Sequence, residues 1–345
     1  MCSLSAAPPR PKIAVRKGLA DTSGPNARSA GRVAMIASAS VRTLAEPTAH
    51  RLGFPDYRTR PPSEISWEDD LALATELERA AGRMRFAELA ALLYRLRPPA
   101  RPELQQRHLA HFEVEAEQAA AAMERLAAAG PGALLDVGCG MGRYVAAAVR
   151  AGRPATGVDV ALYQVVLARK LLEQEGLEAR LLLANAEALP FEDGAFAAAT
   201  ATDLLEHVEA PERTVAEVGR ALGPGGMAYF TTPNRYSLTA EPHVGIWGLG
   251  YLPRSRAERL VKRRLGIDYG PIRPLSYPGL RRLLAGSFPG DSEVRPGAPE
   301  PRELATFPPL KRVAARAYLA LGGVPLARAA VARVAPYFVA TGRRR

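Results

Sequence analysis

The chain has 345 residues, of which 48% are hydrophobic and 23% charged, and its formal net charge at pH 7 is +11. This length and composition are typical of a globular protein with one large domain, and they exclude a fully disordered chain. Cys2 and Cys139 are too few for a disulfide framework, and no apolar run is long enough to span a membrane. The first residues lack the apolar stretch of a signal peptide, so we expect a cytoplasmic protein.

The first 130 residues precede the regular part of the sequence. Residues 1–60 are rich in Ala, Pro, Ser and Arg without a sustained period, which predicts a disordered segment or residues upstream of the true start. Ser66 followed by acidic residues is typical of a helix N-terminus, and we expect one helix over 66–94 and another over 102–129. Residues 61–130 are then expected to form a helical cap over the site that follows.

From residue 131 onward, apolar strands and amphipathic helices alternate as in a doubly wound, Rossmann-like α/β sheet. We expect seven strands in a domain over 131–345, with a helical insertion before the last strand. The strands are expected at 133–137, 154–158, 179–184, 197–202, 226–232, 292–296 and 336–341. The helices are expected at 141–151, 162–175, 211–222, 277–285 and 308–334. This domain divides into a core (131–234), a long irregular segment (235–275) and a C-terminal part (276–345).

A glycine-rich loop after the first strand of this domain is the most informative motif. It follows Asp136 and has glycines at alternate positions, Gly138, Gly140 and Gly142. Asp159 ends the next strand, where a carboxylate can accept hydrogen bonds from ribose hydroxyls, so the unit is typical of adenosine-cofactor sites. A dehydrogenase needs its third glycine one residue later, where this chain has Arg143. The spacing therefore favours a cofactor without phosphate groups over NAD.

With the motifs that follow it, this loop resembles class I S-adenosylmethionine-dependent methyltransferases, in particular the ubiquinone-biosynthesis-like (methyltransferase type 11) branch. The motifs are Leu135-Asp-Val-Gly-Cys-Gly-Met-Gly142, Gly157-Val-Asp159, Asn185-Ala-Glu-Ala-Leu-Pro-Phe191, Asp203-Leu-Leu-Glu-His-Val208, Leu222-Gly-Pro-Gly-Gly226 and Thr232-Pro-Asn234. The resemblance implies S-adenosyl-L-methionine as the cofactor. It places at this cofactor Asp136, Gly138, Gly140, Gly142, Asp159, Val160, Asn185, Ala186, Glu187 and Asp203. Asn185 stands where this branch commonly has aspartate, so its bond to the adenine is expected to be weaker.

The segment after the fourth expected strand offers a group of catalytic candidates. Asp203, Glu206 and His207 have the spacing of one helical turn, so their side chains can face one point. Three interpretations stay open. His207 is a general base for an acceptor hydroxyl, the three residues bind a divalent ion as in some similar O-methyltransferases, or Glu206 and His207 brace the sheet edge. Our expectation is a site without metal.

The segment after Thr232 is the expected acceptor site, because ligands of open α/β sheets lie beyond the carboxyl ends of the strands. Its hydrogen-bonding groups alternate with flat apolar side chains, which suits a sugar, a phenol or a polar lipid head, although a packing loop is the simpler alternative. His243 is a second candidate for catalysis. The candidate substrate-binding residues are Asn234, Arg235, Tyr236, Trp247 and Tyr251.

The resemblance implies methyl transfer to a small-molecule, glycan or lipid-linked acceptor, with oxygen as the expected atom. Two alternatives stay open: an RNA or DNA methyltransferase, and a protein that binds the cofactor without catalysis. The basic charge permits a nucleic-acid partner, but no binding module is recognisable and none is expected. The arginine-rich residues 254–264 are either a solvated helix face or a contact with a membrane or a lipid-linked substrate. The sequence does not indicate the oligomeric state.

Overall fold

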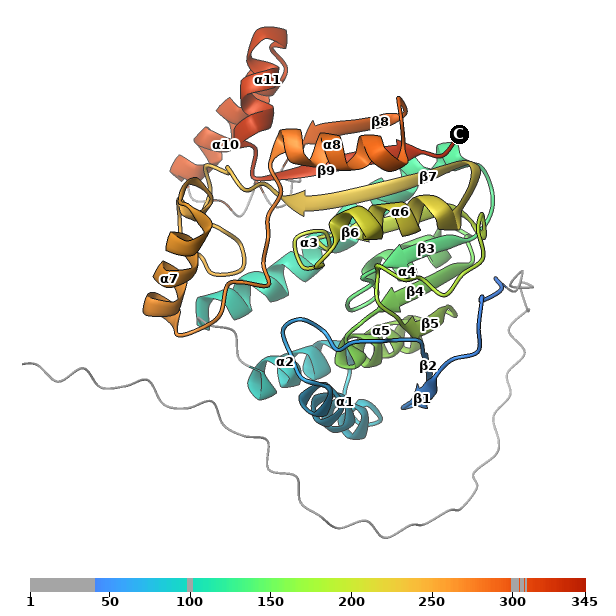
Figure 1. Ribbon diagram of the computed structural model, residues 1–345. Coiled ribbons are helices and arrows are strands. Elements are labelled where there is room, and N and C mark those ends of the chain that lie inside the picture. The colour runs from blue at the N-terminus through green and yellow to red at the C-terminus, as the bar shows by residue number, and fades with distance from the viewer. Residues whose placement is uncertain (1–40, 98–101, 299–303, 305–306, 308) are drawn as a thin grey trace, which may run out of the picture.

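The chain folds around one nine-stranded sheet with helices on both faces (Figure 1). The structure is a computed structural model that describes residues 41–97, 102–298, 304, 307 and 309–345. The strand order is β1-β2-β5-β4-β3-β6-β7-β9-β8, and the five strands from β5 to β7 in this order are parallel. The strands are β1 (Ala49–Arg51), β2 (Phe54–Asp56), β3 (Leu134–Val137), β4 (Ala155–Asp159), β5 (Arg180–Leu183), β6 (Phe196–Thr202), β7 (Leu222–Pro233), β8 (Ser292–Pro296) and β9 (Tyr337–Arg343).

The helices alternate with the strands from β3 onward, so the predicted doubly wound fold is confirmed. The helices are α1 (Trp67–Ala81), α2 (Phe86–Leu96), α3 (Pro102–Leu126), α4 (Arg143–Arg150), α5 (Leu162–Glu175), α6 (Pro211–Ala221), α7 (Arg254–Leu265), α8 (Tyr277–Ser287), α10 (Pro309–Gly322) and α11 (Pro325–Val334), with short 3-10 turns η1 (Ala127–Ala129) and η2 (Leu249–Tyr251). The insertion before the last strand is the projecting pair α10 and α11. Among the described residues, no helix is long and apolar enough to cross a membrane.

Within the described part of the chain the sheet has nine strands and not seven, because β1 and β2 form a hairpin at its edge. β2 pairs in parallel with β5 through Asp56 and Leu183. The prediction of a disordered segment is therefore wrong for residues 41–60, whereas residues 1–40 lie outside the described part of the chain. Strands of three residues are too short to show a hydrophobic period, and for this reason the sequence pattern did not reveal them.

The helix expected over 66–94 is in fact two helices. Ser66 caps α1 as predicted, and its hydroxyl accepts a hydrogen bond from the amide of Asp69 at 3.1 Å. The helix ends at Gly82, and α2 begins after Arg85, whose amide donates to the side chain of Glu88 at 2.7 Å. Glycine destabilises a helix interior and the second capping interaction restarts it, which explains the break.

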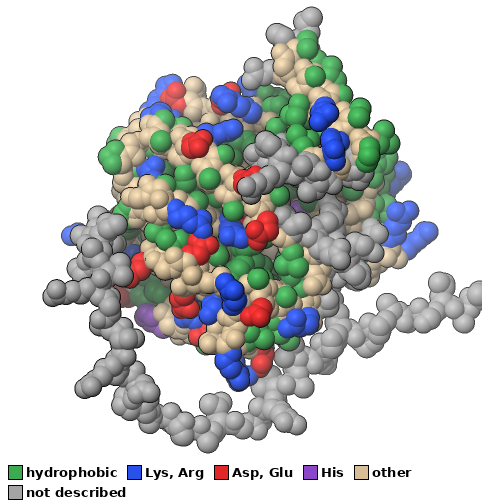
Figure 2. All heavy atoms as spheres, turned by 180° about the vertical axis from the view of Figure 1, so that it is seen from behind, with side chains coloured by type: hydrophobic (Ala, Val, Ile, Leu, Met, Phe, Trp, Pro, Cys, Tyr) green, Lys and Arg blue, Asp and Glu red, His purple; other side chains and the backbone are tan. Residues whose placement is uncertain are grey.

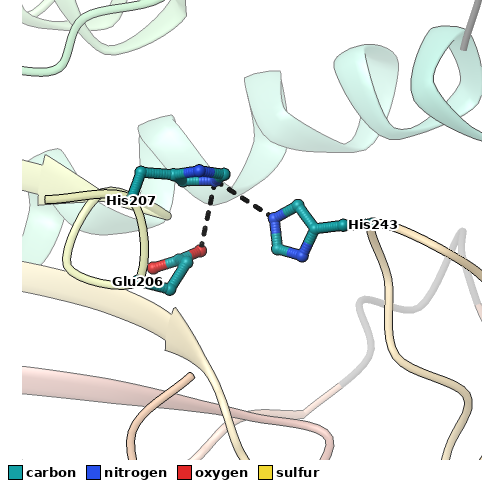
Figure 3. Close-up of side chains that lie close together, drawn as sticks. All are labelled: Glu206, His207 and His243. Atoms are coloured by element: carbon teal, nitrogen blue, oxygen red, sulfur yellow. Dashed lines mark hydrogen bonds and ion pairs between the residues drawn. The ribbon is translucent and has the colours of Figure 1, made fainter. Parts of the chain in front are cut away.

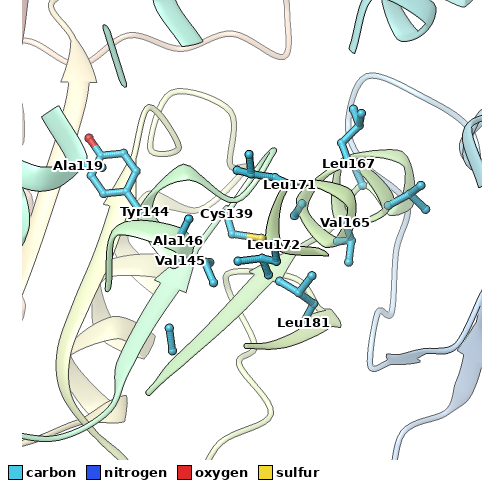
Figure 4. Close-up of a cluster of buried hydrophobic side chains, with 14 of the residues drawn as sticks. Ala119, Cys139, Tyr144, Val145, Ala146, Val165, Leu167, Leu171, Leu172 and Leu181 are labelled. Atoms are coloured by element: carbon cyan, nitrogen blue, oxygen red, sulfur yellow. The ribbon is translucent and has the colours of Figure 1, made fainter. Parts of the chain in front are cut away.

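The N-terminal helices extend one face of the sheet and do not form a separate body. Leu73 of α1 and Leu89 of α2 belong to the same buried cluster as the side chains of α4 and α5. Figure 4 shows part of this cluster, in which Ala119 of α3 and Cys139 of the glycine loop lie among the side chains of those helices. A second buried cluster, which includes residues of α6 and α8, covers the other face. The rigid sheet between them presents the carboxyl ends of its parallel strands at one edge.

Candidate functional site

The glycine loop between β3 and α4 forms an open floor at the carboxyl edge of the sheet. The amides of Gly138 and Cys139 donate to the carbonyl of Val158 at 2.8 and 2.9 Å. Gly142, with φ of +86°, precedes α4, and a Cβ there would lie 3.0 Å from that of Ala168. A Cβ on Gly140 would meet nothing within 4 Å among the described residues, so space lies above the loop.

Asp136 lies at the end of β3, below this floor, and is 1% exposed. Its Oδ1 accepts a hydrogen bond from the hydroxyl of Thr200 at 2.7 Å, whereas its Oδ2 has no hydrogen-bond partner among the described residues. Burial raises the pKa of this carboxyl to about 7, and the bond from Thr200 opposes the shift. A buried oxygen without a partner is a place where a ligand donor fits.

Asp159 is held at the end of β4 by two backbone amides. Its Oδ2 accepts from the amide of Gly140 at 2.9 Å, and its Oδ1 accepts from the amide of Ala161 at 2.8 Å. Each carboxylate oxygen can accept more than one hydrogen bond, so the group keeps capacity for two hydroxyl donors. The structure thus places Asp159 beside the open floor.

Residues 57–64, named the strap below, cross the ends of β4 and β5. Arg58 donates to the carbonyl of Val160 at 2.7 Å. The amide of Thr59 donates to the Oδ1 of Asn185 at 2.9 Å, and the amide nitrogen of Asn185 donates to the carbonyl of Arg60 at 3.3 Å. The side chain of Asn185, expected at the adenine edge, therefore binds the strap.

The other two residues of that motif differ in their contacts. Ala186 is buried in the core, and Glu187 forms an ion pair with Arg60 of the strap. No signal in the sequence marked the strap as part of the site, because its contacts with residues 185–187 join segments about 125 residues apart.

Asp203 is exposed at the end of β6 and has an unusual backbone conformation. Its φ is +47°, and its Oδ1 accepts from the hydroxyl of Thr231 at 3.0 Å. A non-glycine residue in this region is strained and often marks a functional site. Residues 205–207 form a turn and not a helix, so Asp203 does not join Glu206 and His207 as the predicted spacing required.

His243 joins Glu206 and His207 instead, and the three form a compact group (Figure 3). The Nε2 atoms of the two imidazoles lie 3.1 Å apart, and the Nε2 of His207 lies 4.0 Å from the Oε1 of Glu206. The fold thus brings together the two residues that were predicted to be catalytic, although they lie 36 positions apart in the sequence. The structure therefore groups Glu206 and His207 with His243 and not with Asp203.

Carboxylates on either side determine the electrostatics of this group. Glu64 lies 3.0 Å from the Nδ1 of His207, and Glu241 lies 2.6 Å from the Nδ1 of His243. Burial alone lowers the pKa of His207, but the bond to Glu64 and the charge of Glu206 outweigh it and raise that pKa to about 9. Burial raises the pKa of Glu206 to about 7. The surrounding carboxylates therefore make His207 a stronger base than a free histidine.

A cavity of about 730 Å³, named the acceptor cavity below, opens beside His207 at the ends of β6 and β7. Asn234 and Arg235 line it as expected. The side-chain amide nitrogen of Asn234 is nevertheless occupied within the protein, because it donates to the carbonyls of Arg333 and Ala335 at 2.9 Å each. Its main effect is to hold the end of β7 against the last helix.

The three aromatic candidates of the loop point outward and do not line the acceptor cavity. Tyr236, Trp247 and Tyr251 are 37%, 67% and 49% exposed. Apolar residues between them, such as Ile246 and Leu249, point inward and build a small core with α7. The rest of the cavity wall lies within 235–275 but is made by residues that the sequence did not single out, including Leu252, Arg254, Asp268, Tyr269 and Arg273.

Comparisons with known proteins agree with this geometry. A family model described as a methyltransferase domain matches residues 135–230. The ubiquinone biosynthesis O-methyltransferase of Paracidovorax citrulli is 32% identical over 179 residues, which cover 47% of this chain and 73% of that protein. The enzyme of the same name from Nitrosococcus oceani is 38% identical over 103 residues, which cover 30% of this chain and 44% of that protein. The chain spans about half the length of most of the curated relatives it matches.

Solved structures match this chain at lower sequence identity than these relatives do. A geranyl diphosphate C-methyltransferase from Streptomyces coelicolor is 20% identical, with a TM-score of 0.46, and the match covers 68% of this chain and 80% of that one. At this identity the likeness concerns the fold alone.

Proposed function

This chain belongs to the S-adenosylmethionine-dependent methyltransferase family, and we propose that it methylates an oxygen atom of a small-molecule acceptor. One observation supports this most directly. The glycine floor with the partnerless Oδ2 of Asp136 and the acceptor cavity both lie at the carboxyl edge of the same parallel sheet. Donor and acceptor sites at one edge are what an in-line transfer requires.

The residues around the glycine floor fit the cofactor. We assign its amino-acid part to Asp136 and its ribose to Asp159, because each side chain has acceptor capacity facing the floor. The bound cofactor supplies an activated methyl group. The protein then has to hold the acceptor oxygen in line with that methyl group and receive the proton of the hydroxyl.

His207 and His243 are the side chains we assign to that hydroxyl. His207 lines the acceptor cavity, and the Nε2 of His243 lies 3.1 Å from that of His207. Ubiquinone biosynthesis O-methyltransferases are among the relatives, so an aromatic hydroxyl is the acceptor we favour. A cytoplasmic location remains a prediction from the sequence.

S-adenosylmethionine and S-adenosylhomocysteine are expected to raise the melting temperature of the chain, because ligands that bind the folded state stabilise it by mass action. NAD should have no effect, since Arg143 occupies the position of the third dehydrogenase glycine. Thermal denaturation in the presence of each ligand in turn measures the shift of the melting temperature. A shift with NAD and none with S-adenosylhomocysteine would contradict the proposed cofactor.

We also propose that the acceptor is reached at a membrane surface. Tyr236, Leu238, Trp247 and Tyr251 are exposed large side chains close together, because Trp247 donates to the carbonyl of Leu238 and Tyr251 to that of Tyr236. The helix that follows them, α7, has five exposed cationic residues, Arg256, Arg259, Lys262, Arg263 and Arg264. On the face in Figure 2, by contrast, Lys and Arg alternate with Asp and Glu, which does not favour a nucleic-acid groove.

Removing two of these cations is expected to weaken binding to vesicles that contain anionic phospholipid. The double variant Arg263→Gln with Arg264→Gln should lose about 2 kcal/mol of vesicle binding, because each cation near such a surface contributes about 1 kcal/mol. The matched control replaces Arg281 and Arg282, two exposed cations on α8, with Gln. Cosedimentation measures both, and equal losses in the two variants would contradict a surface centred on α7.

A further inference from the structure

We propose that the acceptor carries an anionic group, a carboxylate or a phosphate, which Arg273 and the hydroxyl of Tyr269 bind at the wall of the acceptor cavity. Both side chains line the cavity that His207 also lines. The inference rests on the proposed function, since it names the class of molecule that the chain methylates.

The two residues lie at the ends of one turn, which is joined to the segment that carries His207. Within the turn, the amide of Ile272 donates to the carbonyl of Tyr269 at 3.2 Å. The amide of Arg273 donates to the carbonyl of Glu206 at 2.7 Å. An anion bound at this turn therefore shares the cavity with the imidazole that we assign to the acceptor hydroxyl.

Tyr269 supplies a hydrogen-bond donor that no protein atom uses. The residue is 4% exposed, and its hydroxyl has no hydrogen-bond partner among the described residues. The guanidinium of Arg254 holds the ring in place, because it lies 4.9 Å from the ring centroid and donates to the carbonyl of Tyr269 at 2.7 Å. Burial raises the pKa of the hydroxyl, so it keeps its proton and can donate to an anion in the cavity.

Arg273 supplies a positive charge to the same wall. Its side chain is exposed, and its guanidinium has no carboxylate partner within the described part of the chain. A guanidinium presents its N–H groups in a planar fork that matches two oxygens of a carboxylate or a phosphate. Arg235, a second arginine of the wall, donates from its Nε to the carbonyl of Gly250 at 3.2 Å and likewise has no carboxylate partner among the residues described.

The carboxylates of the cavity wall leave this positive charge in excess. Three of the four pair with a basic side chain: Glu209 with Arg60, Glu241 with His243, and Glu258 with Arg254. The fourth, Asp268, accepts from the amide of Gly270 at 3.0 Å and has no cationic partner in the described ranges. Two unpaired guanidinium groups against one unpaired carboxylate favour an anion in the cavity.

An acceptor of this class is held at two points. Its hydroxyl faces His207, while its anionic group binds the fork of Arg273 and the hydroxyl of Tyr269. Two fixed points orient the acceptor ring, and a fixed orientation is what an in-line transfer requires. Arg273 and Tyr269 are therefore binding residues that determine which acceptors are used.

The test compares two probes of nearly equal shape, protocatechuate and its uncharged amide, by isothermal titration calorimetry on the full chain saturated with S-adenosylhomocysteine. The wild type should bind the carboxylate about 10- to 100-fold more tightly than the amide, since hydrogen bonds to charged groups are the stronger ones. Arg273→Gln should remove most of this preference and leave the Kd of the amide unchanged. Tyr269→Phe keeps the ring and should weaken carboxylate binding by about 2- to 10-fold.

Arg282→Gln is the matched control, because Arg282 is an exposed arginine of α8 that does not line the cavity. It should keep the preference of the wild type. Competition then identifies the anion. Displacement of protocatechuate by phenyl phosphate at a lower concentration than by benzoate assigns a phosphate to the site, and the opposite order assigns a carboxylate.

Equal binding of protocatechuate and its amide by the wild type would overturn the inference. An unchanged preference in Arg273→Gln, or an equal loss in Arg282→Gln, would overturn it too. Methyl transfer is followed on the same samples as S-adenosylhomocysteine formed from S-adenosylmethionine. Arg273-dependent binding without transfer to either probe contradicts the proposed function and leaves the anion site standing, whereas transfer to both probes without a preference for the carboxylate does the reverse.

Discussion

Arg58→Met is expected to lower the free energy of unfolding by about 3–5 kcal/mol, the cost of removing one partner from a buried ion pair. Arg58 is 6% exposed and contacts two buried carboxylates. It donates to Asp56 at 2.8 Å and to Asp70 at 2.8 Å. Asp70 in turn accepts from the first amides of α5, so the same charge joins the strap, α1 and the end of β4. Urea denaturation of wild type and variant measures the difference.

The matched control is Arg51→Met, which removes a second cation from the same carboxylate. Arg51 donates to Asp56 at 2.7 Å, but its side chain is 37% exposed. Exposed ion pairs contribute about 0–1 kcal/mol, so this variant should lose at most that amount. Equal losses in the two variants would mean that the buried network around Arg58 does not stabilise the fold. Because Arg58 also contacts Val160, its variant should in addition bind the cofactor less tightly.

Asp159→Asn is expected to raise the Kd for S-adenosylhomocysteine by about 10- to 100-fold. Hydrogen bonds to a charged group contribute about 1.5–3 kcal/mol, and the amide keeps only one of the two acceptor oxygens. The substitution leaves the shape of the side chain unchanged at the end of β4. Isothermal titration calorimetry on the full chain measures the affinity directly.

Asp193→Asn provides the control for this change. Asp193 is an exposed aspartate that pairs with Arg220, away from the glycine floor. It should bind S-adenosylhomocysteine as the wild type does. An unchanged Kd in Asp159→Asn, measured beside that control, would mean that the ribose lies elsewhere.

The irregular segment 235–275 shows what the sequence did not indicate about the site. The residue types in 235–275 correctly indicated a cavity beside the end of β7, because loops at that edge line ligand sites. Which side chains line it depends on how the loop folds onto α7. Trp247 and Tyr251 looked like binding residues but point outward, while Leu249 between them is buried. A loop without a period gives no indication of which side chains point inward.

The sequence by itself determined the strands and helices from β3 onward, the glycine loop and its acid at Asp159, and hence the family. These are local features, since periodicity, capping and glycine spacing act within a few residues. Only the tertiary structure decided that His243 meets His207 and that the strap reaches Asn185. The contact between Glu64 and His207 joins residues 143 positions apart. Such contacts depend on how the elements pack, and no local pattern encodes which distant side chains packing brings together.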